Sequence, residues 1–244
     1  MAIKVTFLYN SGFMVETDND ILIFDDCEDP AHSVVKALKH NPEKNVLFLT
    51  SHNHSDHFNK FIFDLAQNHR RMYILSDDII STETPDTAAI GWMHKGDVIE
   101  NIFDGIRIKA FGSTDAGVSY MVELPDGKRI FHAGDLNNWH WDEASTEREI
   151  AKANEAFTVI VNRIAEEYPA VDIAFFPIDV RLGKNRAAGA EQFLAAIKTA
   201  NFFPMHFKGS YEEACDFGAY NFSDTVKKET KFYCLHKPGQ SVEL

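Results

Sequence analysis

Three histidines and one aspartate are concentrated in the segment Ser51-His52-Asn53-His54-Ser55-Asp56-His57-Phe58, although the whole chain contains 11 histidines. Imidazole nitrogens and carboxylate oxygens are ligands that zinc, iron and manganese accept in proteins. The alternating His-x-His spacing lets two side chains in an extended turn point at one ion, and the Asp-His pair can then face a second ion. The segment therefore predicts a metal site. Its predicted ligands are His52, His54, Asp56 and His57.

The same segment resembles the His-x-His-x-Asp-His signature of the metallo-β-lactamase fold hydrolases. Further strings match in order along nearly the whole chain, and they resemble the branch that includes ascorbate-phosphate lactonase and small uncharacterised metal-dependent hydrolases. These strings are Phe131-His132-Ala133-Gly134-Asp135, Phe176-Pro177-Ile178-Asp179 and Pro204-Met205-His206. The resemblance implies an α/β fold, a four-layer αββα sandwich in which residues 1–244 form a single domain built from two similar halves.

The resemblance also implies roles for residues outside the histidine segment. Asp135 would bridge two metal ions, and His206 would be the last histidine ligand. Asp25 ends the string Ile21-Leu22-Ile23-Phe24-Asp25 and matches a family position that supports the metal loop by contacting its ligands. On sequence alone, an ordinary turn aspartate is an equally good interpretation of Asp25.

One loop departs from the family pattern. The family usually supplies a third histidine to the first ion from this position, but the loop here reads Gly112-Ser113-Thr114-Asp115-Ala116-Gly117. We predict that Asp115 replaces the missing histidine, which would shift the metal preference from zinc toward manganese or iron, or weaken occupancy of the first site. Two other histidines are alternatives. His94 is interpreted as a surface residue, and strand alternation places His132 on the face opposite to Asp135, as a core or supporting residue.

Cations gather in the segment Asp179-Val180-Arg181-Leu182-Gly183-Lys184-Asn185-Arg186. We predict that Asp179, Arg181 and Lys184 contact the substrate, because a planar guanidinium binds a phosphate or carboxylate through two parallel hydrogen bonds. A solvated loop is the alternative interpretation. Trp139 and Trp141 would form an apolar wall of the pocket or pack beneath the following helix, and packing is favoured.

The predicted elements place these residues at strand ends. Hydrophobic and β-branched runs separated by turn residues predict a first block of strands and one helix. Its members are strands Ile3–Tyr9, Gly12–Thr17, Ile21–Asp25 and Asn45–Leu49, with a helix around Val34, Val35 and Leu38. The second block has a β-rich stretch Val98–Ala133 with an Asp126-Gly127 hairpin, helices over Glu143–Tyr168 and Ala187–Ala200, and strands Val171–Phe176 and Asn201–Met205. The order of strands followed by helix and strand thus occurs twice.

The composition limits the function classes. The 244 residues carry 24 Lys and Arg against 37 Asp and Glu, and the net charge of −13 argues against nucleic acid as a partner. The sequence shows no secretion signal and no apolar run long enough to predict a membrane span. Cys27, Cys215 and Cys234 are odd in number and far apart, so neither a disulfide framework nor a zinc ribbon is indicated, and a cytoplasmic protein fits best.

The leading hypothesis is a metal-dependent hydrolase with two divalent ions, zinc first, with Mn²⁺ or Fe²⁺ as alternatives. One ion would be held by His52, His54 and Asp115, the second by Asp56, His57 and His206, with Asp135 bridging. A metal-bridged hydroxide, formed because the ions lower the pKa of bound water to about 7, would attack a small anionic ester, lactone or phosphoester. Asp56 and Asp135 are the expected catalytic residues. A mononuclear iron oxidoreductase and a non-catalytic metal-binding protein are the alternatives, and the oligomeric state stays open.

Overall fold

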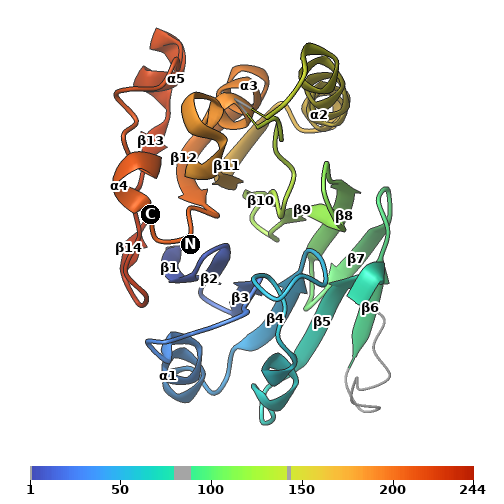
Figure 1. Ribbon diagram of the computed structural model, residues 1–244. Coiled ribbons are helices and arrows are strands. Elements are labelled where there is room, and N and C mark those ends of the chain that lie inside the picture. The colour runs from blue at the N-terminus through green and yellow to red at the C-terminus, as the bar shows by residue number, and fades with distance from the viewer. Residues whose placement is uncertain (1, 80–88, 142–143) are drawn as a thin grey trace. The chain divides into compact units, whose positions relative to one another are not determined.

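The computed structural model describes residues 2–79, 89–141 and 144–244 (Figure 1). The chain divides into two compact units. Unit 1 consists of residues 1–94 and 235–244, and unit 2 consists of residues 95–234. Each unit contains one seven-stranded sheet. Each unit also contributes helices, so the predicted α/β class is confirmed.

The sheet of unit 1 has the strand order β14-β1-β2-β3-β4-β5-β6. Its strands are β1 (Lys4–Tyr9), β2 (Gly12–Glu16), β3 (Asp20–Phe24), β4 (Asn45–Thr50), β5 (Arg71–Ser76), β6 (Ile90–Met93) and β14 (Ser241–Glu243). The pairs from β14 to β3 are antiparallel, and those from β3 to β6 are parallel. Because β1 pairs with β14, the first and last strands of the chain lie side by side.

Among the described residues of unit 1, helix α1 (Ser33–His40) covers the sheet. It places Val34, Ala37 and Leu38 against buried side chains of the central strands. Strands β2 and β3 are buried along their whole length. A short 3₁₀ turn, η1 (Lys60–Asp64), packs Ile62 and Phe63 into the same core. The parallel pairing of β3 with β4 brings their carboxyl ends to one edge of the sheet, where Asp25 and the histidine segment follow.

The sheet of unit 2 has the strand order β13-β12-β11-β10-β9-β8-β7. Its strands are β7 (Val98–Ile102), β8 (Ile106–Gly112), β9 (Val118–Glu123), β10 (Arg129–His132), β11 (Ala170–Pro177), β12 (Lys198–Met205) and β13 (Lys231–Phe232). Three antiparallel pairs, from β7 to β10, are followed by three parallel pairs, from β10 to β13. The sheet of unit 1 has the same succession of three antiparallel and three parallel pairs.

The helices of unit 2 are α2 (Glu147–Glu167), α3 (Ala188–Ala196), α4 (Tyr211–Ala214) and α5 (Asp224–Glu229). Thr146 caps α2 in a reciprocal arrangement with Glu149, which satisfies exposed N–H groups at the helix start. Glu143, where the sequence predicts this helix to begin, lies outside the described residues. Helices α2 and α3 contact each other, and α3 also contacts β11 and β12 (Figure 1).

The predicted helix over Ala187–Ala200 is too long. Helix α3 ends at Ala196, and Ile197 is already extended, with φ −126° and ψ 116°. Lys198 pairs with Ala170 and Thr199 with Val171, so these residues belong to β12. Burial of the β-branched Thr199 beside the parallel strand β11 overrides the helical periodicity of the preceding segment.

The cysteine spacing indicates no disulfide framework, but the structure contains one disulfide. Cys215 and Cys234 form a disulfide that closes a span of 19 residues in unit 2. The chain from α4 through α5 turns back to β13, and this return brings the two distant positions together, which spacing alone does not reveal. Cys27 is a free, buried cysteine. Because disulfides are rare in reducing compartments, this bond weighs against the argument for the cytoplasm that rests on cysteine spacing.

No helix among the described residues combines the length and the apolar character that crossing a membrane requires.

Candidate metal centre

The histidine segment follows β4 in unit 1 and turns back on itself. The backbone N–H groups of His57 and Phe58 both donate to the carbonyl of His54, at 2.9 Å, which closes the turn. His52 Nε2 and His54 Nδ1 lie 3.0 Å apart. His52 and His57 are fully buried, whereas His54 is exposed. Two imidazole nitrogens therefore converge at the rim of the sheet, as a shared ion requires.

Asp25 fixes the start of this segment. Its Oδ1 accepts the backbone N–H of Ser51 at 2.7 Å, and its Oδ2 accepts the Ser51 hydroxyl at 2.7 Å. Asp25 Oδ2 also lies 2.7 Å from His57 Nδ1. A carboxylate against Nδ1 keeps the proton there and leaves the Nε2 lone pair available to a metal ion. The sequence left a turn aspartate as an equal alternative, and these contacts show that Asp25 holds the histidine segment.

Ser51 extends the contact from Asp25 to a second histidine. Its hydroxyl lies 2.9 Å from His52 Nδ1, so the Nε2 atom of His52 faces His54. Asn10, in the turn between β1 and β2, holds Asp56. Its Nδ2 donates to the Asp56 carbonyl and to Asp56 Oδ2, both at 3.4 Å. Asn10 lies in the β1–β2 turn with φ +50°. Sequence reasoning missed Asn10, and its left-handed backbone could not be read from the residue type.

Asp135 follows β10 in unit 2 and is buried. Its carbonyl accepts the Trp139 indole N–H at 2.8 Å, and Trp139 packs edge-on to the ring of His206 at 5.7 Å. Asp135 Oδ1 lies 3.5 Å from His206 Nε2. The two unit 2 residues predicted as ligands therefore lie together. Trp139 contacts both of them, a closer role than the packing beneath a helix that the sequence favoured.

Asp179 holds His206 and Arg181. Asp179 Oδ2 lies 3.1 Å from His206 Nδ1, and the Arg181 Nε donates to Oδ1 at 2.9 Å and to Oδ2 at 3.0 Å. The terminal nitrogen of Arg181 pairs with Asp179 as well. Burial acts to raise the pKa of Asp179, but hydrogen bonds from Arg181 and His206 hold it well below its usual range. Asp179 is therefore an anion that orients His206.

The remaining predicted residues are more exposed. Arg181 has a side chain 47% exposed and lies 5.6 Å from the ring centre of Trp141, over its face. Lys184 is exposed in the 3₁₀ turn η3 (Val180–Asn185). Asp115 is exposed, and its N–H donates to Ser113 Oγ at 3.3 Å. Beside it, the Thr114 hydroxyl donates to the Asn137 carbonyl at 2.6 Å and accepts the Asn137 N–H at 2.9 Å. This tie between the Asp115 loop and the loop after Asp135 was also missed.

The two alternative histidines have structural roles. His132 is fully buried in β10, where its Nδ1 accepts the Gly134 N–H at 3.2 Å and its ring packs on Phe175. His94 is largely exposed and pairs with Asp77 at 2.9 Å. The structure thus agrees with the interpretation of His132 as a supporting residue and of His94 as a surface residue.

The donors present suit a metal ion. In each unit a histidine that follows a strand has its Nδ1 against a buried aspartate, His57 in unit 1 and His206 in unit 2. A second predicted ligand lies beside each of them: the ring centre of His52 is 4.1 Å from that of His57, and Asp135 Oδ1 is 3.5 Å from His206 Nε2. Metal-binding histidines in proteins are oriented by a carboxylate or carbonyl on the opposite ring nitrogen. Imidazole and carboxylate donors together fit zinc, manganese or iron.

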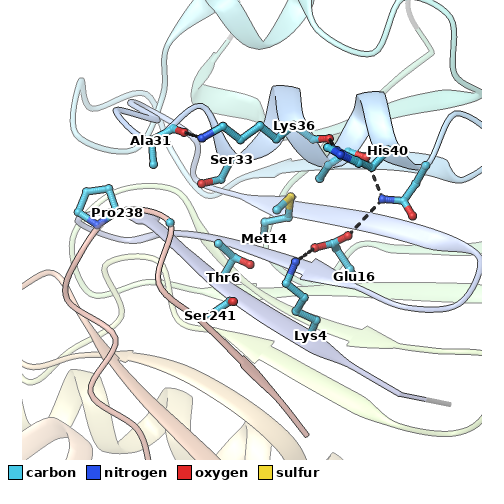
Figure 2. A pocket seen from close by; sticks show the side chains of 13 residues that line it. Lys4, Thr6, Met14, Glu16, Ala31, Ser33, Lys36, His40, Pro238 and Ser241 are labelled. Carbon is cyan, nitrogen blue, oxygen red and sulfur yellow. Dashed lines mark hydrogen bonds and ion pairs between the residues drawn. The ribbon is translucent and has the colours of Figure 1, made fainter.

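A cavity of about 490 Å³ lies elsewhere in unit 1, between α1 and the strands β14, β1 and β2 (Figure 2). Figure 2 shows Lys4 reaching Glu16 from the strands, while Lys36 on the helix points to the Ala31 carbonyl. Its lining residues include none of the predicted metal ligands. This cavity is therefore separate from the histidine segment.

A known protein is similar to this chain over nearly its whole length. A UPF0173 metal-dependent hydrolase from Pelotomaculum thermopropionicum is 28% identical over 265 aligned residues, which cover 99% of this chain and 100% of the relative. No protein-family model matches the sequence.

Solved structures show the fold. A metallo hydrolase, Igni18, from Ignicoccus hospitalis matches with a TM-score of 0.66 at 16% identity, over 100% of this chain and 99% of the other. The metallo-β-lactamase fold protein YhfI from Bacillus subtilis matches with a TM-score of 0.51 at 11% identity, over 100% of both chains. The resemblance inferred from the sequence is confirmed: the chain has the metallo-β-lactamase fold and is similar over its full length to a metal-dependent hydrolase.

Proposed function

We propose that this chain is a metal-dependent hydrolase. The observation that supports the proposal most is the histidine segment of unit 1, in which His52 and His54 nitrogens converge at 3.0 Å while Asp25 holds Nδ1 of His57. Imidazole nitrogens that converge in this way can bind a cation, and the similarity to a metal-dependent hydrolase supports the same conclusion.

The proposed ligands are those that the sequence predicts, with residues 1–244 acting as a single domain. His52, His54 and Asp115 would hold one ion, Asp56, His57 and His206 the second, and Asp135 would contact both. Two divalent ions, with zinc as the preferred metal, would supply Lewis acidity when bound and would lower the pKa of a bound water. Asp115 is the replacement for the histidine that the Gly112–Gly117 loop lacks, and manganese or iron would gain from its harder oxygen.

The chain's own residues orient the ligands and move the proton. Asp25 and Asp179 keep the Nδ1 protons of His57 and His206 in place. Asp56 is half-buried, and its Oδ2 is positioned by the Asn10 amide. We assign to Asp56 the task of orienting the attacking water and accepting its proton, because its carboxylate is a proposed ligand that Asn10 holds in place.

The proposed substrate is a small anionic ester, lactone or phosphoester. Arg181 would bind its charged group, since Asp179 and the face of Trp141 fix the guanidinium while nearly half of the side chain is exposed. Lys184 would add a second positive charge. Asp179 would act on the substrate only through Arg181, a narrower role than the direct contact predicted from sequence.

The test is turnover of a panel of lactones and phosphoesters by purified protein, before and after chelation and after reloading with zinc or manganese. Asp135→Ala should abolish turnover and leave the circular dichroism spectrum unchanged. Asp126→Ala, in the exposed hairpin of unit 2, is the matched control and should keep full activity. Undiminished turnover by Asp135→Ala, or by the chelated wild type, would contradict the proposal.

The loop without a histidine supports one alternative, a mononuclear iron oxidoreductase on the same fold. Exposed Asp115 is the acidic residue of that loop, and loss of the first ion would leave a single site built on Asp56, His57 and His206. Protein that retains one iron per chain and consumes oxygen, with no hydrolysis across the panel, would favour this alternative.

A further inference from the structure

A second cavity in unit 1, of about 400 Å³, lies between the segment that follows β3, the start of α1 and the turn η1. One part of its wall is apolar: Pro30, Val34, Val35, Phe61 and Leu65. The other part is acidic: Asp26, Glu28 and Asp29. Its volume falls in the range of small-molecule sites, which combine apolar walls with a few polar groups.

The acidic wall contains buried oxygens that lack partners. Asp26 is 3% exposed, and neither of its carboxylate oxygens has a hydrogen-bond partner among the described residues. The same holds for Oδ1 of Asp29, whose Oδ2 accepts the Val34 N–H at the start of α1 at 2.8 Å. Three buried carboxylate oxygens without donors are costly, because a buried anion needs a counter-charge or hydrogen bonds.

The acidic wall is not matched by a lysine or an arginine. Among the described residues that line the cavity, His32 is the one basic side chain. The cavity in Figure 2 differs in this respect, since Lys4 and Asn41 both donate to the buried Glu16, at 2.9 and 3.4 Å. Burial, with the nearby Asp29, raises the pKa of Asp26 to about 7. The carboxyl therefore exists partly as an anion at neutral pH and attracts a cation.

A metal ion is a poor fit for this cation. Among the described residues, no third ligand atom of His, Cys, Asp or Glu joins Asp26 and Asp29 within the 4.8 Å that a shared ion requires. The apolar wall also has no use in binding a hydrated ion. An alkylammonium group fits both features, because its N–H groups can donate to several carboxylate oxygens while its carbon chain lies on the apolar side.

We propose that this cavity binds the ammonium group of a small primary amine, with Asp26 and Asp29 as acceptors and Val34, Val35, Phe61 and Leu65 around its apolar part. The site is distinct from the proposed metal ligands, and the inference does not depend on hydrolase activity.

The test measures binding of n-butylamine to the full, metal-loaded chain at pH 8, in a buffer free of other amines, by thermal shift and ligand-observed NMR. The uncharged 1-pentanol is the matched ligand control. Asp26→Asn removes the charge at the site, and Asp18→Asn removes an equal charge from the exposed β2–β3 turn of the same unit.

The wild type and Asp18→Asn should bind the amine with equal affinity. The affinity of Asp26→Asn should be lower by a factor of about ten or more, which is the usual loss when a charge-assisted hydrogen bond disappears. For all three proteins, the affinity for pentanol should be lower than the affinity of the wild type for the amine. Equal amine binding by Asp26→Asn, equal binding of pentanol by wild type, or an Asp26-dependent response to Mg²⁺ or Ca²⁺ in place of the amine would each overturn the proposal.

Discussion

His57 in unit 1 and His206 in unit 2 are both held at Nδ1 by a buried aspartate, but the two aspartates are neutralised differently. Asp25 accepts the Ser51 N–H and hydroxyl, which are uncharged donors within one loop. Asp179 accepts the guanidinium of Arg181, whose side chain is half exposed. The first arrangement is sealed in the core of its unit, whereas the second reaches solvent through a cation that a ligand could contact.

The backbone strain is also placed differently in the two units. In unit 1 the aspartate has the left-handed backbone conformation, with φ +43° at Asp25. In unit 2 the histidine has it, with φ +61° at His206. Residues held in this region cost about 1–3 kcal/mol and persist where surrounding contacts determine them. Asp25 is thus a structural centre of its loop, and Asp179 is a link between a histidine and an arginine.

The largest effect is expected from Asp25→Ala. This change leaves the Ser51 N–H and hydroxyl and the His57 ring without their buried acceptor, so the free energy of unfolding should fall by about 3–5 kcal/mol. Metal affinity should also fall, by about 10- to 100-fold. Urea unfolding and metal titration measure these two losses. If Asp25→Ala lost less unfolding free energy than Asp179→Asn, the proposed difference between the two aspartates would be contradicted.

A third buried aspartate, Asp26, accepts neither an uncharged nor a charged donor among the described residues. Its substitution should therefore raise the free energy of unfolding, whereas substitution of Asp25 should lower it. Because burial raises its pKa in the folded chain to about 7, from 3.8, its ionisation destabilises the fold as the pH rises from about 4 to 7. Asp26→Asn removes this cost and should stabilise the protein by about 1–4 kcal/mol at pH 8 and by little at pH 4. Urea unfolding at both pH values, with Asp18→Asn as control, checks the prediction. An equal effect at the two pH values would refute it.

Asp179→Asn should cost less than the Asp25 change, about 1–3 kcal/mol at pH 7, because Arg181 can turn toward water. The pKa of Asp179 lies below its ordinary value of 3.8, so its contribution is present above that pH and is lost as the pH falls below it. The stability gap between wild type and Asp179→Asn should therefore narrow on acidification below about pH 4. Thermal unfolding from pH 7 to pH 3 measures the gap, and a widening gap would show that Asp179 is not the stabilising anion.

The smallest effect is expected at Thr114, whose hydroxyl ties two loops of unit 2 by neutral hydrogen bonds to Asn137. Thr114→Val keeps the shape and removes both bonds, which should cost about 1 kcal/mol. Thr225→Val, in helix α5 of the same unit, controls for the change of residue type. A cost at Thr114 as large as that of Asp25→Ala would show that neutral ties in unit 2 matter as much as the Asp25 network.

Much of this architecture could be predicted from the sequence. Continuous hydrophobic runs such as Ile21–Phe24 and Asn45–Leu49 identify the central strands as buried, and residues at the ends of parallel strands must share one edge of a sheet. The histidine segment and Asp135 could be placed at such edges for the same reason. The repeated order of antiparallel and parallel pairs in both units follows from two similar strings of elements.

The supporting contacts could not be predicted, because they join positions far apart in the chain. Asn10 reaches Asp56 across 46 residues, and Thr114 reaches Asn137 across 23. Nothing in a local pattern distinguishes these two residues from ordinary turn residues. The Cys215–Cys234 bond was missed for the same reason, since only the return of the chain from α4 to β13 brings the cysteines together.

The most direct test of the account is the number of metal ions per chain, determined by elemental analysis of protein purified without added metal, for the wild type and for Asp135→Ala. About two divalent ions are expected in the wild type and a clear loss in the variant, because Asp135 is a proposed ligand of both ions. No bound metal in the wild type, or the same metal content in both proteins, would contradict the central claim that Asp135 and the histidine segment hold metal ions.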